Sequence, residues 1–328
     1  MPGSRSLVRF RFASLGIATA LACVACTATS GGMHSNGTAT RRPAITIGAF
    51  DFPESVVLAY LYADVLANAG YPVRVLPNLG TRELVDPALM AGLIQVVPEY
   101  TGSALEFVSL GHLHATPNVA ATVGVLASSM AARGLRIGRP AAAQDGNAIV
   151  VTAATAARYR LHTVSDLARM ASRLVFGGPP ECLERPYCLP GLRRVYGLHF
   201  KEFVPLDAGG PLTRQALLAG DIGVALLFTT DPAIKYRHLI VLADNRGLQP
   251  AENVIPVFSQ AIAARYPRLL ALLDAVSARL STATLTNLDA QVQLHNQAPI
   301  EVAESWDLAQ GLVAARPGRG IGAGPPPR

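Results

Sequence analysis

Short apolar runs alternate with helical patterns along most of the chain. Apolar runs at residues 45–47, 73–75 and 93–97 are each followed by a stretch with helical spacing of apolar residues. Short buried strands that alternate with helices are typical of parallel sheets joined by helical connections. The pattern therefore predicts an α/β architecture in which the sheets are mostly parallel and flanked by helices.

The stretch after residue 52 is a clear example of such a helix. Pro53 suits an early helical position, and Gly70 suits the end. Val57, Leu61 and Val65 between them form one apolar stripe that would pack on the sheet. The same reasoning predicts further helices at residues 81–91, 118–132 and 266–280.

Two segments far apart in the chain are similar to each other. Residues 88–97 and 216–225 both read as a helix end, a glycine and a buried strand, and the strands are followed by Tyr100 and Phe228, respectively. Ligands of open α/β sheets bind outside the carboxyl ends of the strands. Either the chain uses one unit twice, with a cleft between the two copies, or the likeness is the ordinary pattern of any α/β chain.

The first 43 residues have the composition of an export signal and a tether. Residues 1–25 combine arginines with an apolar stretch shorter than the roughly 20 residues of a membrane span. Small residues before Cys26 resemble a bacterial lipobox, so Cys26 is the predicted lipidation site, with Cys23 as the alternative. Residues 26–43 are predicted to be a flexible tether, and the Gly/Pro-rich residues 316–328 a disordered tail.

Charge and cysteine content narrow the function. Three of the 28 basic residues lie in the leader, and the remaining 25 face 22 acidic ones, which is too mild a balance for a nucleic-acid binder. Cys182 and Cys188 lie in a proline-rich segment. In an exported protein such a pair predicts a disulfide more readily than a metal site.

The common motifs of enzymes and metal sites do not occur in the sequence. There is no Gly-x-Ser-x-Gly, no phosphate loop and no His-Glu-x-x-His. His112 and His114 are close together but have no carboxylate at ligand spacing, which favours a solvated loop. The sequence therefore predicts a protein that is not an enzyme and that has no metal and no cofactor.

Several motifs together resemble one family. The stretches ITIGAFDFPES (45–55), GYPV (70–73), LGTRE (79–83), PAL (87–89) and PEYTGS (98–103) resemble the osmoprotectant-binding proteins of ABC importers, which take glycine betaine, choline, carnitine and related solutes. The resemblance continues through RP (185–186), LPGL (189–192), YGL (196–198) and FTTD (228–231), and covers about residues 44–310.

This resemblance implies a periplasmic binding protein fold of type 2, with two α/β lobes joined by two crossing strands and a ligand cleft between them. Residues 44–143 plus 246–315 would form lobe 1, and residues 144–245 lobe 2. The protein would be a monomer, anchored by lipid to the outer face of the cytoplasmic membrane, that delivers a small solute to the permease subunits of an ABC importer.

The family binds an ammonium group in a cage of aromatic rings and a carboxylate at a basic residue. By position, Tyr100 matches a cage tyrosine, Ser103 a hydroxyl and Arg185 the basic residue, while Phe228 replaces a tyrosine. Phe50 stands where the family has a lysine, and Asn147 and Arg214 stand near cage tyrosines. The predicted ligand-binding residues are Phe50, Phe52, Tyr100, Ser103, Asn147, Arg185, Arg214, Phe228 and Thr229.

The prediction for the ligand follows from these residues. Tyr100 and Phe228 should face each other across the cleft, with Arg185 and Arg214 supplying positive charge. An unpaired buried charge is costly, so plain choline is disfavoured and a carboxylated solute such as glycine betaine comes first. An uncharged planar or polyhydroxyl compound is the second choice. A binding protein that signals to a membrane sensor is the alternative role, and a secreted enzyme comes last.

Overall fold

The computed structural model describes residues 43–314. The predicted leader, the tether up to residue 42, both candidate lipidation cysteines and the predicted tail lie outside these residues. No single helix within residues 43–314 is long and apolar enough to cross a membrane, although the pair Leu269–Ser277 and Thr282–Gln293, bent by 88°, together meets the length and composition criteria.

One five-stranded sheet has the order β2-β1-β3-β10-β4. Its strands are β1 (Ile45–Gly48), β2 (Val73–Leu76), β3 (Val96–Tyr100), β4 (Leu135–Ile137) and β10 (Val254–Ser259). Strands β2, β1 and β3 are parallel, whereas β10 runs antiparallel to both β3 and β4. One strand therefore opposes the other four, and the sheet is mixed rather than purely parallel.

The second sheet repeats this arrangement in the order β7-β6-β8-β5-β9. Its strands are β5 (Asn147–Thr152), β6 (Val175–Gly178), β7 (Glu202–Pro205), β8 (Val224–Phe228) and β9 (Leu239–Val241). Strands β7, β6 and β8 are parallel, and β5 is antiparallel to β8 and β9. Because β3 and β8 hold equivalent places in the two sheets, the repeated unit predicted from residues 88–97 and 216–225 is confirmed.

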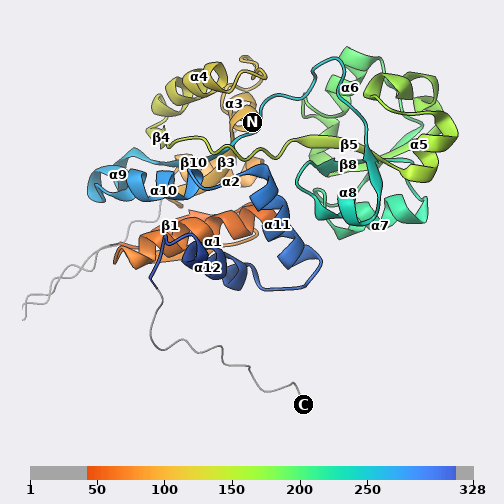
Figure 1. Ribbon diagram of the computed structural model, residues 1–328. Helices are drawn as coiled ribbons and strands as arrows, with labels where there is room; N and C mark the ends of the chain where they lie inside the picture. Colours follow the sequence, from red (N-terminus) through yellow and green to blue (C-terminus); the bar gives the residue numbers. More distant parts are fainter. Residues whose placement is uncertain (1–42, 315–328) are drawn as a thin grey trace, which may run out of the picture. The chain divides into compact units, whose positions relative to one another are not determined.

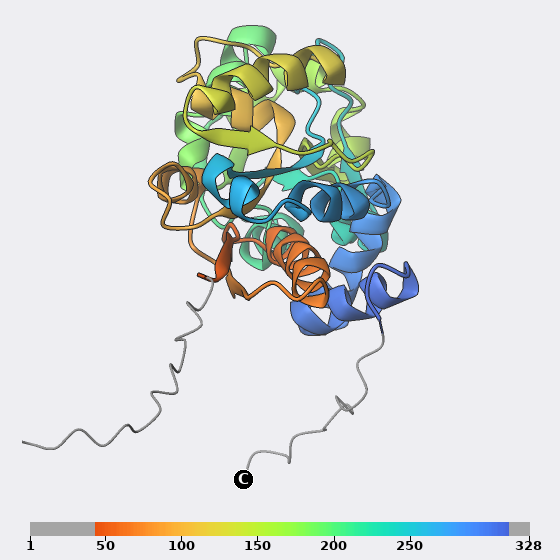
Figure 2. The same ribbon diagram turned by 90° about the vertical axis from the view of Figure 1, so that its left-hand side faces the viewer.

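The helices divide between the two sheets (Figure 1). The first sheet carries α1 (Pro53–Asn68), α2 (Arg82–Met90), α3 (Thr101–Val108), α4 (Val119–Ala131), α9 (Gln260–Arg265), α10 (Leu269–Ser277), α11 (Thr282–Gln293) and α12 (Pro299–Ala309). The second carries α5 (Ala153–Tyr159), α6 (Leu189–Tyr196), α7 (Pro211–Ala219), α8 (Pro232–Tyr236) and the 3₁₀ helices η1 (Val164–Arg169), η2 (Ala171–Arg173) and η3 (Pro180–Leu183). Helices α10, α11 and α12, the last three in the sequence, pack against α1, the first (Figure 2).

The predicted helices at 53–70, 81–91 and 118–132 are confirmed as α1, α2 and α4. Two predicted boundaries are wrong. The strand expected at 93–97 begins only at Val96, because the chain leaves α2 through a turn at Gly92, whose φ is 73°. The helix expected from residue 266 begins at Leu269, because Pro267 disfavours the helical conformation of the residue before it.

Strand β5 shows how the core of the second sheet is built. Its apolar residues alternate, with Ala148 and Val150 in one buried cluster and Ile149 and Val151 in another. Successive side chains of a strand point to opposite faces of the sheet. A continuous apolar run therefore suits a strand covered on both faces, as in other α/β proteins.

Two connections run between the sheets, one from β4 to β5 and one from β9 to β10. They contact each other through an isolated antiparallel bridge between Gln144 and Asn253, and the Asp145 amide donates to the Glu252 carbonyl oxygen at 3.0 Å. Each connection leads into the one antiparallel strand of a sheet. Residues just before β5 and β10 are thereby held beside the carboxyl ends of β8 and β3.

Candidate functional site

A cavity of about 750 Å³ lies at the carboxyl ends of the parallel strands of both sheets. Segments that follow β1, β2, β3, β6 and β7 line it, as do residues of β8 itself and residues just before β5 and β10. This is the edge where open α/β sheets bind their ligands. Seven of the nine predicted ligand-binding residues line this cavity: Phe50, Phe52, Tyr100, Ser103, Asn147, Arg185 and Phe228.

Aromatic rings form one wall of the cavity. Phe52 lies 6.0 Å from Tyr100 and 5.3 Å from Phe228 between ring centroids, and Phe50 stacks on it at 5.9 Å. Tyr100 and Phe228 were predicted to face each other, but the structure joins them through Phe52. Tyr100 and Phe228 end β3 and β8, and Phe50 and Phe52 follow β1, so the strands fix the positions of the rings.

Phe50 is held in place from two sides. Its amide donates to Ser55 Oγ at 2.9 Å, and the guanidinium of Arg82 lies 5.0 Å from the ring centroid. Arg82 forms two 2.9 Å hydrogen bonds with the buried carboxylate of Glu99. Because Glu99 already pairs with it, Arg82 supports the aromatic wall, and its charge is compensated.

Tyr100 is almost fully buried and connects the cavity to α1. Its hydroxyl donates to Glu54 Oε1 at 2.6 Å. Burial raises the pKa of the Glu54 carboxyl well above its usual value, and the nearby charge of Asp289 raises it further. Burial and then the Glu54 charge likewise raise the pKa of Tyr100, so the phenol stays a hydrogen-bond donor.

The residues before β10 and β5 contribute a carboxylate each. Glu252 accepts from the amides of Gly102 and Ser103, both at 3.0 Å, and from the Ser103 hydroxyl at 2.6 Å. Asp145 accepts from the Thr230 amide at 3.0 Å. The two carboxylates thus bind equivalent backbone segments, those that follow β3 and β8. Burial raises the pKa of Glu252 to about 7 despite these hydrogen bonds.

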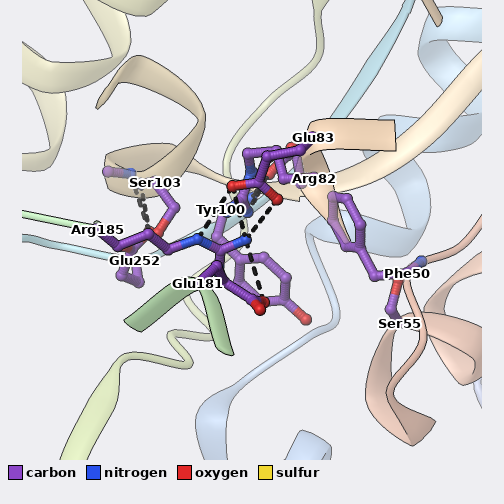
Figure 3. Close-up of polar contacts among 11 residues, drawn as sticks. Phe50, Ser55, Arg82, Glu83, Tyr100, Ser103, Glu181, Arg185 and Glu252 are labelled. Carbon is purple, nitrogen blue, oxygen red and sulfur yellow. Dashed lines mark hydrogen bonds and ion pairs between the residues drawn. The ribbon is translucent and has the colours of Figure 1, made fainter. Parts of the chain in front are cut away.

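Arg185 lies on the segment closed by the disulfide between Cys182 and Cys188, which confirms the predicted pairing. Its guanidinium contacts Glu83 at 3.0 Å and Glu181 at 3.4 Å (Figure 3). Although partial burial alone would raise it, hydrogen bonds from Thr81 and Arg185 lower the pKa of Glu83 to about 2. Glu83 belongs to α2 of the first sheet, so this ion pair connects the two lobes.

A second contact between lobes comes from the same loop. The Tyr187 hydroxyl accepts from the Ala115 amide at 3.3 Å and donates to Glu106 at 3.4 Å. Asn147 donates from Nδ2 to the Tyr187 carbonyl oxygen and to Gln249 Oε1, both at 3.3 Å. The disulfide loop is therefore fixed on both sides of the cavity.

Two predicted ligand-binding residues do not line the main cavity. Arg214 pairs with Asp231 at 3.0 Å and donates to Gln293 at 2.6 Å. Thr229, which directly follows β8, accepts from the Gly146 amide at 3.0 Å and so contacts the crossing segment before β5. Because Arg214 and Arg185 are both paired with carboxylates, the reasoning that unpaired arginines disfavour choline is wrong.

Sequence reasoning missed several residues of the cavity and its surroundings. They are Glu54, Glu83, Asp145, Tyr187, Glu252 and Asp289. Asp145 and Glu252 precede β5 and β10, which run antiparallel to the neighbouring strands. Because of that direction, both residues lie at the carboxyl ends of the parallel strands. Within residues 43–314, no group of three or more His, Cys, Asp or Glu side chains is arranged to hold a metal ion.

Comparison with known proteins gives a family match over most of the chain. The model of the substrate-binding domain of ABC-type glycine betaine transport systems matches residues 43–308. A glycine-betaine-binding protein of Pseudomonas aeruginosa is 31% identical over 295 residues, which are 87% of this chain and 92% of that protein.

Two further comparisons are more distant. An ergothioneine transport permease/ergothioneine binding protein of Helicobacter pylori is 24% identical over 79% of this chain and 46% of its own length. The crystal structure of a glycine betaine/carnitine/choline ABC transporter protein superposes with a TM-score of 0.66 at 21% identity, over 82% of this chain and 99% of that one. At this identity the superposition shows a common fold, the two-lobed α/β fold predicted from the sequence.

Proposed function

Because the chain belongs to the family of substrate-binding domains of ABC-type glycine betaine transport systems, and is thus a solute-binding protein of an ABC importer, we propose that its solute is glycine betaine or a close relative. The observation that carries this proposal is the aromatic wall of Phe52, Tyr100 and Phe228 on one cavity. A ring face attracts a quaternary ammonium by about 0.5–2 kcal/mol. Several rings on one wall would hold the trimethylammonium group.

Arg185 is the residue we assign to the carboxylate of the solute. It lines the cavity, where its ion-pair partners are Glu83 and Glu181. A guanidinium has five N–H donors, so it can bind a further carboxylate oxygen. If the ligand carboxylate replaced Glu83 at Arg185, the ion pair between the lobes would break when the ligand binds. Binding would thereby be coupled to the contact between the lobes.

We place the hinge of closure in the two crossing segments, with residues 44–143 plus 246–315 as one lobe and 144–245 as the other. The bond from Asp145 to Glu252 lies where the segments meet. A hinge needs only a few residues at the ends of elements to change their backbone angles. Binding free energy drives closure, and no catalytic group is required.

A larger zwitterion is the second candidate for the solute. The cavity of about 750 Å³ falls within the range of roughly 300–1,000 Å³ that drug-sized ligands fill. Glycine betaine is much smaller than such ligands. A compound that adds a flat ring to the quaternary ammonium and the carboxylate, as ergothioneine does, would contact Phe50 in addition to the other rings.

We further propose that the protein acts outside the cytoplasmic membrane as a monomer, held there by a lipid on Cys26. The small residues before this cysteine support the anchor. The family consists of extracytoplasmic transport proteins, which supports the location and the permease as the partner. Binding in the cleft, without turnover, is the whole activity in this proposal.

Isothermal titration with glycine betaine, choline, carnitine and ergothioneine tests the proposal. Phe52→Leu and Phe228→Leu keep apolar bulk but remove the ring, so each should weaken binding by roughly 2- to 30-fold. Phe200→Leu is the matched control, because Phe200 packs on Phe176 and does not line the cavity. Equal losses in all three variants, or binding of none of the four compounds, would contradict the proposal.

A further inference from the structure

A second, much smaller cavity of about 10 Å³ lies directly behind the aromatic wall. It shares Phe52, Phe228 and Asp145 with the main cavity. Four carboxyl groups line it, and they come from α1, the crossing segment, the start of α8 and α11: Glu54, Asp145, Asp231 and Asp289. The rings that face the solute therefore have carboxyl groups on their far side.

The positive charge near these four groups is small. Among the described residues that line the small cavity there is no Lys, Arg or His, and Arg214 of α7 pairs with Asp231. The other three carboxyl groups are at most 5% exposed. Glu54 Oε2 and Asp289 Oδ1 are buried and have no hydrogen-bond partner among the described residues.

Each of the three remaining groups disfavours the ionised form of another. Burial raises the pKa of Glu54, Asp145 and Asp289. The second-largest cause is in each case the charge of a neighbour, which raises the pKa further. The charge of Asp289 acts on Glu54, that of Glu54 on Asp145, and that of Asp145 on Asp289. Like charges that share a buried site cannot all ionise, so the cluster retains protons at a pH where exposed carboxyl groups have lost theirs.

We propose that Glu54, Asp145 and Asp289 form an acid cluster that recognises the cationic end of the solute from behind Phe52 and releases a proton as the cation enters. This proposal rests on the proposed function, because it takes the solute to carry a quaternary ammonium. No covalent bond changes other than the loss of that proton. A carboxylic acid of the cluster loses it to solvent, and the resulting carboxylate faces the bound cation.

The sign of the effect follows from the charges. A cation at the rings stabilises the ionised cluster, so binding lowers the pKa of the cluster and is linked to proton release. Affinity should therefore rise with pH through the range in which the free cluster titrates, and level off above it. The other groups that face the cluster are the Tyr100 hydroxyl, which donates to Glu54, and the ion pair of Asp231 with Arg214.

Titration calorimetry with glycine betaine between pH 5.5 and 8.5, in two buffers of different ionisation enthalpy, counts the protons released. For one proton the affinity should rise by up to about tenfold per pH unit. Its isostere 3,3-dimethylbutanoate has the same shape and the same carboxylate, but a neutral tert-butyl group replaces the trimethylammonium cation. In competition the isostere should bind at least tenfold more weakly at pH 8 and show no such rise with pH.

Asp289→Asn removes one acid without touching Tyr100, and it should reduce both the proton count and the slope of affinity against pH. Glu54→Gln is the second variant, in case the first does not fold. Asp307→Asn is the matched control, because Asp307 is buried on α12 and lies outside both cavities. It should leave the proton count unchanged.

Two results separate the proposal from its premise. Glycine betaine that binds with pH-independent affinity and no proton release, or a proton count that neither Asp289→Asn nor Glu54→Gln changes, overturns the acid cluster and leaves the proposed function intact. Failure of glycine betaine, choline, carnitine and ergothioneine all to bind at any pH refutes the proposed function, and this proposal with it.

Discussion

Asp307→Asn should stabilise the protein, and increasingly so as the pH rises. Asp307 lies on α12 where it packs on α1, and both carboxyl oxygens are buried with no hydrogen-bond partner among the described residues. Burial, and then the charge of Asp64, raise the pKa of Asp307 from 3.8 to about 8. The folded protein therefore favours the protonated acid, whereas the unfolded chain ionises it.

The size of the effect follows from these values. The contribution of Asp307 to stability is fully present below pH 3.8 and is lost as the pH rises to about 8. At pH 7 the loss has an upper limit of about 4 kcal/mol, at 1.36 kcal/mol per pH unit. The amide of the introduced asparagine is also buried without a partner, which costs about 1–3 kcal/mol, though the carboxylic acid has a similar cost. We expect a net gain of about 1–3 kcal/mol at pH 7.

Thermal unfolding followed by circular dichroism between pH 4 and 9 tests this prediction. A gain of 1 kcal/mol raises Tm by roughly 2–4 °C in a chain of this size. The difference between variant and wild type should vanish near pH 4 and level off above pH 8. Glu301→Gln, an exposed change on the same helix, should stay within about 0.5 kcal/mol at every pH. A pH-independent difference, or one that is largest in acid, would refute the reasoning.

Three further predictions concern the backbone, the disulfide and the anchor. Gly191→Ala should destabilise the protein by more than about 2 kcal/mol in urea unfolding, because the new methyl group meets the carbonyl oxygen of Pro186, whereas Gly124→Ala, in open space on α4, should stabilise it by about 0.5–1 kcal/mol. Cys182→Ser should cost roughly 2 kcal/mol, and a reducing agent should lower the Tm of wild type but not of this variant. Cys26→Ala should move the protein from the membrane fraction to the soluble fraction, and retention in the membrane fraction would contradict the proposed anchor.

Much of the first sheet could be predicted because its signals are local. The stripe of α1, the proline at its start and the glycine after it all lie within one stretch of chain, and the structure places the helix at Pro53–Asn68. The same holds for the disulfide, whose two cysteines are six residues apart. Local signals also located Tyr100 and Phe228, since each residue lies within a few positions of the end of an apolar run. These features require no knowledge of which strands become neighbours.

Pairing of charges could not be predicted in the same way. Arg214 and Asp231 are 17 residues apart in sequence, and Arg185 and Glu83 are 102 apart. The sequence alone left both arginines without partners, and so it assigned their charge to the ligand. In the structure Asp231 and Glu83 compensate them. The groups behind Phe52 are instead carboxyl groups, and no described Lys or Arg lines the small cavity there.

The direction of one strand in each sheet decides where those carboxyl groups lie. If β5 and β10 ran parallel to β8 and β3, the residues before them would lie at the amino-terminal edge, away from the ligand. Because both run antiparallel, Asn147 pairs with Phe228 and Val254 with Tyr100, and the residues two positions earlier reach the carboxyl edge. Asp145 and Glu252 are those residues. The connections that join the two sheets therefore also carry acids into the cavity. If the proposed hinge and binding site are correct, a change of charge at either acid would act on both.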